Sequence, residues 1–296
     1  MAAIAGQQQT DLREPKGWRR TSNRIMTWLM VIAFVLVLVP LGFVLVTTVA
    51  KGISIISWQF LTGDIPPNVV PANIGGMGPA IVGTIEITAV ATIMAVPLGI
   101  LGAIYLNEYG GKNWLAALIG FFSDVMTGVP SIIMGLFIFA IWVLHFGFSG
   151  FAGALALGCL MLPIVIRSTY EMLRLVPNAL REGSYALGAT KARVTMTVVL
   201  PAAIGGIVSG AMLAVARAVG ETAPLLFTIL TVTTVNKNVF SGPNTSLPSQ
   251  IFANANSPFV GAQARGWGAA LTLIVIAFVL MIAARFITAR FSRFSR

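Results

Sequence analysis

Long apolar runs are the feature that most limits how this chain can fold. About 20 apolar residues cross a bilayer as a helix, because a helix satisfies every backbone polar group within its own segment. We therefore expect an all-α membrane protein with six transmembrane helices, at roughly Ile25–Ala50, Pro79–Leu106, Val125–Leu144, Phe151–Ile166, Leu200–Val219 and Trp267–Ile287.

The composition supports the same class. Of the 296 residues, 57% are hydrophobic and only 9% are charged, whereas soluble domains carry about 25% charged residues. The first apolar run is longer than the ~7–15 apolar residues of a cleavable signal peptide, so we expect it to be retained. The single cysteine, Cys159, lies in an apolar run and excludes an intrachain disulfide.

Basic residues predict the orientation in the inner (cytoplasmic) membrane. The net charge is +10, and without a nucleic-acid motif we interpret it as positive-inside topology and expect no nucleic-acid partner. Both termini, the arm 1–24 and the tail 291–296, are predicted to be cytoplasmic. Most basic residues fall on that side: Arg13, Lys16, Arg19, Arg20, Arg24, Lys112, Arg174, Arg181, Lys191, Arg193, Arg285, Arg290, Arg293 and Arg296, against Lys51, Lys237 and Arg265 on the other.

Two long segments, Gly52–Gly78 and Thr231–Gly266, are predicted to face outward. They are rich in Pro, Asn, Ser and Gly, which is typical of loops. They are either a docking surface for a partner or plain connections, and the sequence leaves both open.

The segment between the fourth and fifth spans has a distinctive spacing. Glu182-Gly183-Ser184-Tyr185-Ala186-Leu187-Gly188 is followed, after nine residues, by Val198-Val199-Leu200-Pro201. Gly188 can end a helix by adopting a positive φ, and Pro201 is tolerated in a first helical turn. The pattern predicts a short helix beneath the membrane, a turn and then re-entry.

This spacing resembles the EAA loop of bacterial ABC-importer permeases, with Gly183, Ser184 and Val198 as departures. In that family the loop is a coupling helix that docks on the ATPase. The resemblance implies a type I ABC importer permease fold, with 25–290 as the transmembrane permease domain. It also implies that ATPase coupling is carried by Glu182, Gly183, Ser184, Ala186, Leu187, Gly188 and Ala189.

A wider run from Leu162 to Phe227 resembles the phosphate permease (PstA) subfamily. The resemblance rests on Arg167-Ser168-Thr169-Tyr170-Glu171-Met172-Leu173-Arg174-Leu175-Val176-Pro177 and on Ala216-Arg217-Ala218-Val219-Gly220-Glu221-Thr222-Ala223-Pro224-Leu225-Leu226-Phe227. It implies phosphate import by alternating access, with a second PstC-like permease, two PstB-like ATPases and an extracytoplasmic PstS-like phosphate-binding protein as partners.

The chain has no phosphate-binding P-loop, no metal-ligand spacing and no catalytic constellation. We therefore expect a transporter subunit, not an enzyme, with no cofactor of its own; ATP and Mg would be bound by the partner ATPase. The alternatives are a permease for another oxyanion or small solute, and, in a different class, a membrane-embedded enzyme or channel that needs no ATPase.

Five ionisable residues lie in or beside the apolar spans: Glu86, Asp124, Arg167, Arg217 and Glu221. Each charge near a bilayer centre costs at least ~2.5–3.5 kcal/mol on insertion scales, so such residues normally face a cavity or a partner. Arg217 and Glu221 have i,i+4 spacing and can pair. They lie beside a small-residue stripe that permits close helix packing, formed by Gly206, Gly210, Ala214 and Ala218.

Two interpretations of the Arg217–Glu221 pair remain open: a structural ion pair, or a substrate pathway in which Arg217 contacts an oxyanion and Glu221 orients it. Arg167 is either a second oxyanion contact or an arginine that snorkels to the interface. Glu86 is expected at a helix N-terminus and Asp124 at the membrane interface.

Overall fold

The computed structural model describes residues 18–66, 74–111 and 113–292, and within these ranges the fold contains helices and no strands. The predicted basic residues Arg13, Lys16, Lys112, Arg293 and Arg296 lie outside the described residues. The chain divides into two units, one ending at Val49 and the other beginning at Ala50.

Helix α1 (Trp18–Gly52) contains the first predicted span. Its segment Arg20–Gly52 is long and apolar enough to cross a membrane. Pro40 lies inside this helix.

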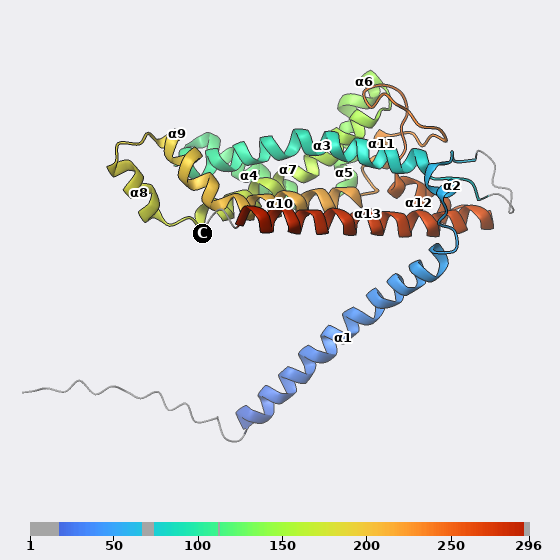
Figure 1. The fold of residues 1–296 in the computed structure, drawn as a ribbon, viewed down its shortest axis with the longest axis horizontal. Helices are drawn as coiled ribbons and strands as arrows, with labels where there is room; N and C mark the ends of the chain where they lie inside the picture. The colour runs from blue at the N-terminus through green and yellow to red at the C-terminus, as the bar shows by residue number, and fades with distance from the viewer. Residues whose placement is uncertain (1–17, 67–73, 112, 293–296) are drawn as a thin grey trace, which may run out of the picture. The chain divides into compact units, whose positions relative to one another are not determined.

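In the second unit the long helices α3, α7, α10 and α13 run side by side (Figure 1). Their bounds are Gly78–Ile104, Gly150–Arg174, Leu200–Val219 and Val260–Ser292. The core between α3, α7 and α10 is built from buried aliphatic and small residues: Ile87, Ala91, Leu157, Met161, Val165, Val215 and Ala218. Helix α7 continues past Arg167 to Arg174, and α13 extends beyond both ends of the predicted span Trp267–Ile287.

The third predicted span, Val125–Leu144, is wrong as a single helix. The structure has α4 (Trp114–Gly128) and α5 (Ser131–Ile138) instead, followed by the π-helix η2 (Phe139–Val143) and the short α6 (Leu144–Phe146). The two arms are bent by 111°. The break falls at Val129, whose backbone is extended, because a following proline disfavours helical geometry. Five described helices can span a membrane, and this bent pair makes a sixth when it is taken as one span.

The fifth span begins earlier than predicted. Helix α9 (Lys191–Val194), the π-helix η3 (Thr195–Val199) and α10 form one continuous apolar stretch. It begins at Lys191 because the Thr190 side chain accepts a hydrogen bond from the Arg193 backbone N–H and caps the helix.

The far end of the fifth span is broken before Pro224, because a proline disfavours helical geometry in the residue before it. Helix α10 stops at Val219, and a short helix α11 (Leu225–Thr228) follows Pro224. The small-residue stripe is also confirmed as a close contact with α7. A Cβ added to Gly206 would lie 2.2 Å from Met172 Sδ, and one added to Gly210 would lie 2.3 Å from Ser168 Oγ.

The two segments predicted as outer loops contain helices, which corrects that prediction. Helix α2 (Trp58–Thr62) lies in the first and α12 (Leu247–Ala255) in the second. Helix α12 forms because Ser246 and Ser249 make reciprocal capping hydrogen bonds at its N-terminus.

Arg265 was counted as an outer-loop residue, and this is wrong. It lies on α13, and only 4% of it is exposed. Its guanidinium donates to Asn254 Oδ1 on α12, with the nearest nitrogen at 2.9 Å, and to the Ile74 carbonyl at 3.2 Å. The charge is therefore part of the anchoring of α12.

Candidate functional site

Helix α8 (Asn178–Ala186) lies in the segment that was predicted to be a short helix followed by a turn, and this geometry is confirmed. It lies with α9 at one end of the second unit, which we call the α8 end, while α2 and α12 lie at the opposite end, the α12 end (Figure 1). Gly188 has a φ of 79°. Its N–H donates to Tyr185 O, and the Ala189 N–H donates to Ser184 O, which is the Schellman motif that ends a helix at glycine.

The α8 segment presents most of its surface outward. Glu182, Gly183, Ala186, Leu187 and Gly188 are all exposed, and Leu187 reaches 89%. Ala189 instead packs against a buried apolar cluster. An exposed leucine beside small residues suits close approach by another protein.

Arg217 and Glu221 form an ion pair, with Arg217 Nε 3.3 Å from Glu221 Oε1. Helix α10 ends at Val219, before Glu221. The two residues are therefore brought together by the last turn of α10 and its C-cap, and not by a helix that continues to Glu221. The Arg217 side chain is 67% exposed and that of Glu221 is 19% exposed. Among the described residues, Nε is the only guanidinium nitrogen of Arg217 with a partner, so its two terminal nitrogens are open.

The neighbours of Arg217 divide the surface of α10 into two faces. Ala214 and Ala218 are buried against α7 and α3. Leu213 is 64% exposed and shares the Arg217 face. The pair therefore lies beside the packed stripe, as the sequence predicted, and the structure places it on the outward face of α10.

Arg167 forms an ion pair with Asp124 of α4. Both side chains are about half exposed. Asp124 is therefore more than an interfacial residue, and Arg167 has a specific carboxylate partner that lies 43 positions earlier in the chain.

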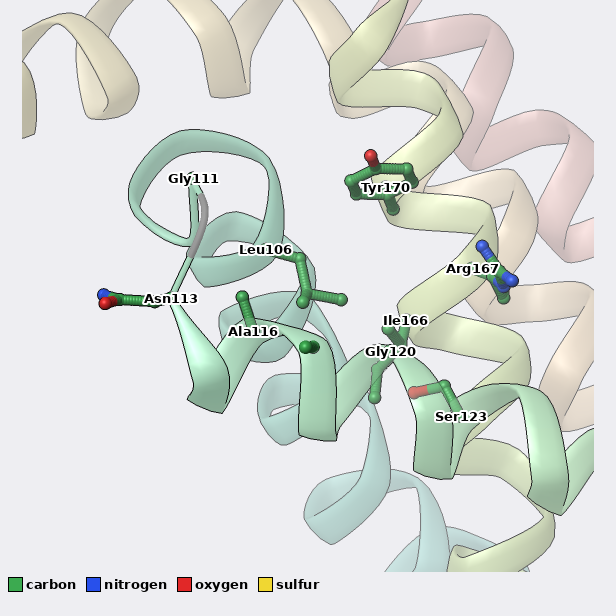
Figure 2. Close-up of a pocket in the computed structure, with 10 residues that line it drawn as sticks. Leu106, Gly111, Asn113, Ala116, Gly120, Ser123, Ile166, Arg167 and Tyr170 are labelled. Atoms are coloured by element: carbon green, nitrogen blue, oxygen red, sulfur yellow. The ribbon is translucent and has the colours of Figure 1, made fainter.

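A cavity of about 340 Å³ lies beside this second pair. Arg167 and Tyr170 of α7 border it on one side, and Asn113, Gly120 and Ser123 border it from the α4 segment (Figure 2). The cavity thus combines a cation with hydroxyl and amide groups.

The structure does not bring Arg167 and Arg217 into one site. Ser168 of α7 faces Gly210 of α10, and Arg217 is seven residues beyond Gly210, or about 10 Å along the helix axis. The two arginines therefore occupy separate levels of the bundle, with Arg167 nearer the α8 end.

Two further predictions concern acids and metals. Glu86 lies within α3 rather than in its first turn, and its Oε2 is buried without a hydrogen-bond partner among the described residues. Across the same residues, no group of three or more His, Cys, Asp or Glu side chains could hold a metal ion.

Besides the Arg167–Asp124 pair, sequence reasoning missed the ion pair between Arg181 of α8 and Glu108, which lies in the π-helical turn that follows α3. The two residues are 73 positions apart. The only available signal was that each is a charged residue beside an apolar span.

The geometry defines a class: a bundle of membrane-spanning helices with an exposed helix at one end and half-exposed charges along its spans. The model of the binding-protein-dependent transport system inner membrane component matches residues 95–293. The chain belongs to this family. It is thus a multi-pass inner-membrane transport permease subunit, not an enzyme, and it works with binding-protein and ATPase components.

Curated relatives support this assignment over nearly the whole chain. The phosphate transport system permease protein PstA 1 of Mycobacterium tuberculosis is 42% identical over 282 residues, which cover 92% of this chain and 91% of that protein. PstA of Yersinia pestis is 42% identical and covers 94% of both chains. PstA of Haemophilus influenzae is 41% identical and covers 88% of this chain and 92% of that protein. Within its family the chain therefore belongs to the phosphate transport system permease proteins PstA.

Solved structures confirm the fold. A chain of the inward-facing MetNI methionine ABC transporter has a TM-score of 0.59 at 18% identity, covering 73% of this chain and 95% of that one. A chain of a bacterial ABC transporter for the acidic polysaccharide alginate has a TM-score of 0.58 at 12% identity, covering 92% and 98%. The predicted all-α type I ABC importer permease fold is therefore confirmed.

Proposed function

We propose that this chain carries inorganic phosphate across the cytoplasmic membrane by alternating access, as one permease subunit of an ATP-driven importer. The observation that carries the proposal is the 42% identity to phosphate permeases across 92% of the chain. The open Arg217–Glu221 pair supports it independently.

The exposed face of α10 is the substrate pathway in this proposal. A guanidinium facing lipid at this depth is costly, so Arg217 must border water, substrate or a partner. Its two terminal nitrogens are open, and a guanidinium fork matches two oxygens of a phosphate. Glu221 limits the positive potential, so the anion is held weakly enough to leave.

Arg167 and Asp124 form a second station in this pathway. A phosphate that leaves Arg217 would next meet the Arg167 guanidinium, about 10 Å further towards the α8 end by helix geometry. Asp124 already occupies Arg167, so the anion competes with a carboxylate. That competition favours release rather than capture.

Energy enters from a partner subunit. The segment formed by Glu182, Gly183, Ser184, Ala186, Leu187, Gly188 and Ala189 docks through its exposed side on an ATPase that binds ATP and Mg, while this chain needs no cofactor. The full assembly has a paralogous PstC-like permease, two PstB-like ATPases and a PstS-like phosphate-binding protein. The α8 end and both termini face the cytoplasm. The arm 1–24 and tail 291–296 flank the permease domain 25–290.

The alternative is a permease for another oxyanion of similar shape. Uptake of labelled phosphate separates the two, measured in cells that lack this gene and in cells to which it has been restored. Excess arsenate should compete with phosphate, and excess sulfate or molybdate should not. Restored uptake that sulfate or molybdate abolishes would contradict phosphate as the substrate.

A further inference from the structure

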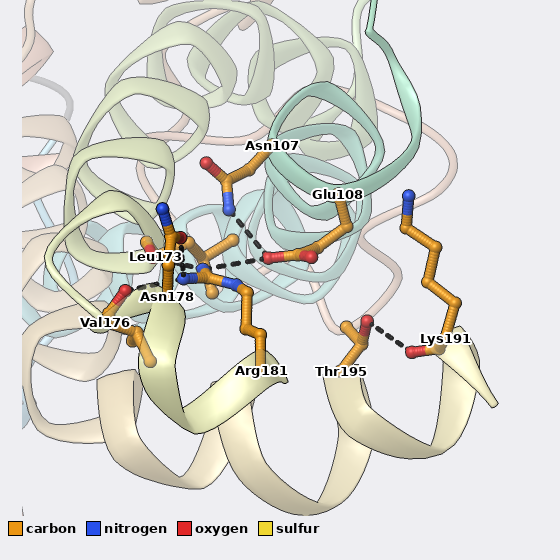
Figure 3. Close-up of polar contacts among 8 residues, drawn as sticks. All are labelled: Asn107, Glu108, Leu173, Val176, Asn178, Arg181, Lys191 and Thr195. Atoms are coloured by element: carbon orange, nitrogen blue, oxygen red, sulfur yellow. Dashed lines mark hydrogen bonds and ion pairs between the residues drawn. The ribbon is translucent and has the colours of Figure 1, made fainter. Parts of the chain in front are cut away.

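The Arg181–Glu108 pair is the most buried ion pair of the described residues. Arg181 Nη2 lies 3.1 Å from Glu108 Oε1, and the two side chains are 13% and 5% exposed (Figure 3). Asn107 Nδ2 donates to the same Oε1 at 2.7 Å. Glu108 lies in the π-helix η1 (Tyr105–Tyr109), which continues α3 at the α8 end.

Arg181 also holds the end of α7. Nη2 donates to the Leu173 carbonyl at 2.9 Å, and Nη1 donates to the Val176 carbonyl at 2.5 Å and to Asn178 Oδ1 at 3.3 Å. One guanidinium of α8 therefore ties the last turn of α7 to the end of α3 (Figure 3).

Helix α9, which follows α8, also contacts η1. Lys191 at the start of α9 places Nζ 5.1 Å from the centre of the Tyr109 ring, a distance at which a cation is attracted to the ring face. Below it, Val194 and Val199 pack with Ala103 and Ile104 of α3 in one buried cluster. Both α8 and α9 thus contact η1.

The end of α3 is in turn packed tightly on α4. Gly110 directly follows η1, and a Cβ added to it would lie 2.7 Å from Ala116 Cβ of α4, so no space separates the two segments. Helix α4 carries Asp124, the partner of Arg167. Direct contacts therefore connect η1, through α4, to the Arg167–Asp124 ion pair beside the cavity.

We propose that Arg181 and Glu108 are positioning residues that transmit the movement of α8 to α3 and α4. This inference rests on the proposed function, because it assumes that a partner displaces α8. In the described part of the chain it is the only ion pair that joins α8 to another helix. A buried pair held by four further hydrogen bonds transmits a displacement, whereas an exposed flexible pair does not.

The test uses the complete importer in vesicles, with Glu108→Gln as the main variant, since it keeps the shape and removes the charge. Arg181→Lys keeps the charge but loses the fork. The reversed pair, Glu108→Arg with Arg181→Glu, tests rescue. The matched control is Glu171→Gln, which removes a carboxylate from an exposed pair with Arg174 in the same region.

The first readout is the number of ATP molecules hydrolysed per phosphate taken up. We expect Glu108→Gln to retain the ATPase and hydrolyse ATP within twofold of wild type, while uptake falls at least tenfold. The reversed pair should recover part of the loss. A proportional fall of hydrolysis and uptake, or normal uptake, would overturn the proposal. Absent uptake by the wild-type importer would contradict the proposed function instead.

The second readout does not depend on the substrate. Ala117 is exposed and lines the cavity, so Ala117→Cys in a Cys159→Ser background reports on α4. Its reaction rate with a charged thiol reagent should change on ATP binding in the otherwise wild-type importer. It should stay constant when Glu108→Gln is added. An unchanged response in that variant would contradict the transmission role.

Discussion

Two arginine–glutamate pairs in this chain, Arg181–Glu108 and Arg217–Glu221, have the same chemistry but differ in burial and in hydrogen bonding. Arg181–Glu108 is buried, and the arginine donates three further hydrogen bonds, to the Leu173 and Val176 carbonyls and to Asn178 Oδ1. Arg217–Glu221 is a single contact through Nε on the open face of α10. The first arginine has little donor capacity left, and the second retains both terminal nitrogens.

The difference teaches that the surroundings of an ion pair decide what it can do. Removing one partner of a buried pair costs about 3–5 kcal/mol, because a charge is left without compensation. An exposed pair contributes about 0–1 kcal/mol. The α10 pair is therefore easily opened by a competing anion, while the α8 pair holds its elements together.

The largest effect should come from Arg217→Ala, which removes the open donors. We expect uptake to be abolished, a loss of at least about 30-fold, since two open donors are lost and each hydrogen bond to a charged group contributes about 1.5–3 kcal/mol. The importer should still assemble, because the side chain is exposed. Uptake of labelled phosphate and co-purification of the subunits measure both. Arg174→Ala, which removes another exposed arginine, is the control, and normal uptake by Arg217→Ala would contradict the pathway.

Next in size is Gly188→Trp at the end of α8. The space around this glycine is open, but its φ of 79° is strained for any residue with a Cβ. A bulky side chain would also obstruct the docking face. We expect the amount of ATPase recovered with the purified subunit to fall about tenfold, which corresponds to a loss of ~1.4 kcal/mol of binding free energy. Unaltered recovery would count against docking at this turn.

A moderate loss of stability is expected from Gly210→Val. Its Cβ would meet Ser168 Oγ at 2.3 Å, and overpacking costs about 1–3 kcal/mol. Gly158→Val on α7 is the control, because a Cβ there meets no atom within 4 Å. Thermal unfolding of the purified importer measures the difference, and equal midpoints for the two variants would refute the close contact of α7 with α10.

The smallest effect should come from Asp124→Asn. The pair with Arg167 is about half exposed, so its contribution to stability is about 0–1 kcal/mol. We expect thermal stability to be nearly unchanged and uptake to change by less than about fivefold, which corresponds to ~1 kcal/mol. If Asp124→Asn unfolded the importer, the Arg167–Asp124 pair would be as important for stability as the buried Arg181–Glu108 pair. That result would contradict the difference between exposed and buried pairs.

Features that depend on neighbouring residues could be predicted from the sequence. The apolar runs predicted most spans, the i,i+4 spacing predicted the pairing of Arg217 with Glu221, and Gly188 predicted the turn after α8. These features arise within a few residues of one helix, so their signal is contained in the local pattern.

Features that depend on distant contacts could not be predicted. Arg167 finds Asp124 across 43 positions and Arg181 finds Glu108 across 73. The burial of Arg265 depends on where α12 packs. Pro130 marks the break between α4 and α5 locally, but the 111° angle between them depends on how both helices pack on α7. In each case tertiary packing determines the contact, and the periodicity of the sequence carries no information about it.

The most direct test asks whether the Arg217 face of α10 borders water or lipid. Leu213 lies one turn before Arg217 on this face, so Leu213→Cys in a Cys159→Ser background reports on it in the assembled importer. We predict that a membrane-impermeant, negatively charged thiol reagent labels this cysteine and that phosphate slows the reaction. Labelling only by a lipid-soluble reagent, with no effect of phosphate, would contradict the account.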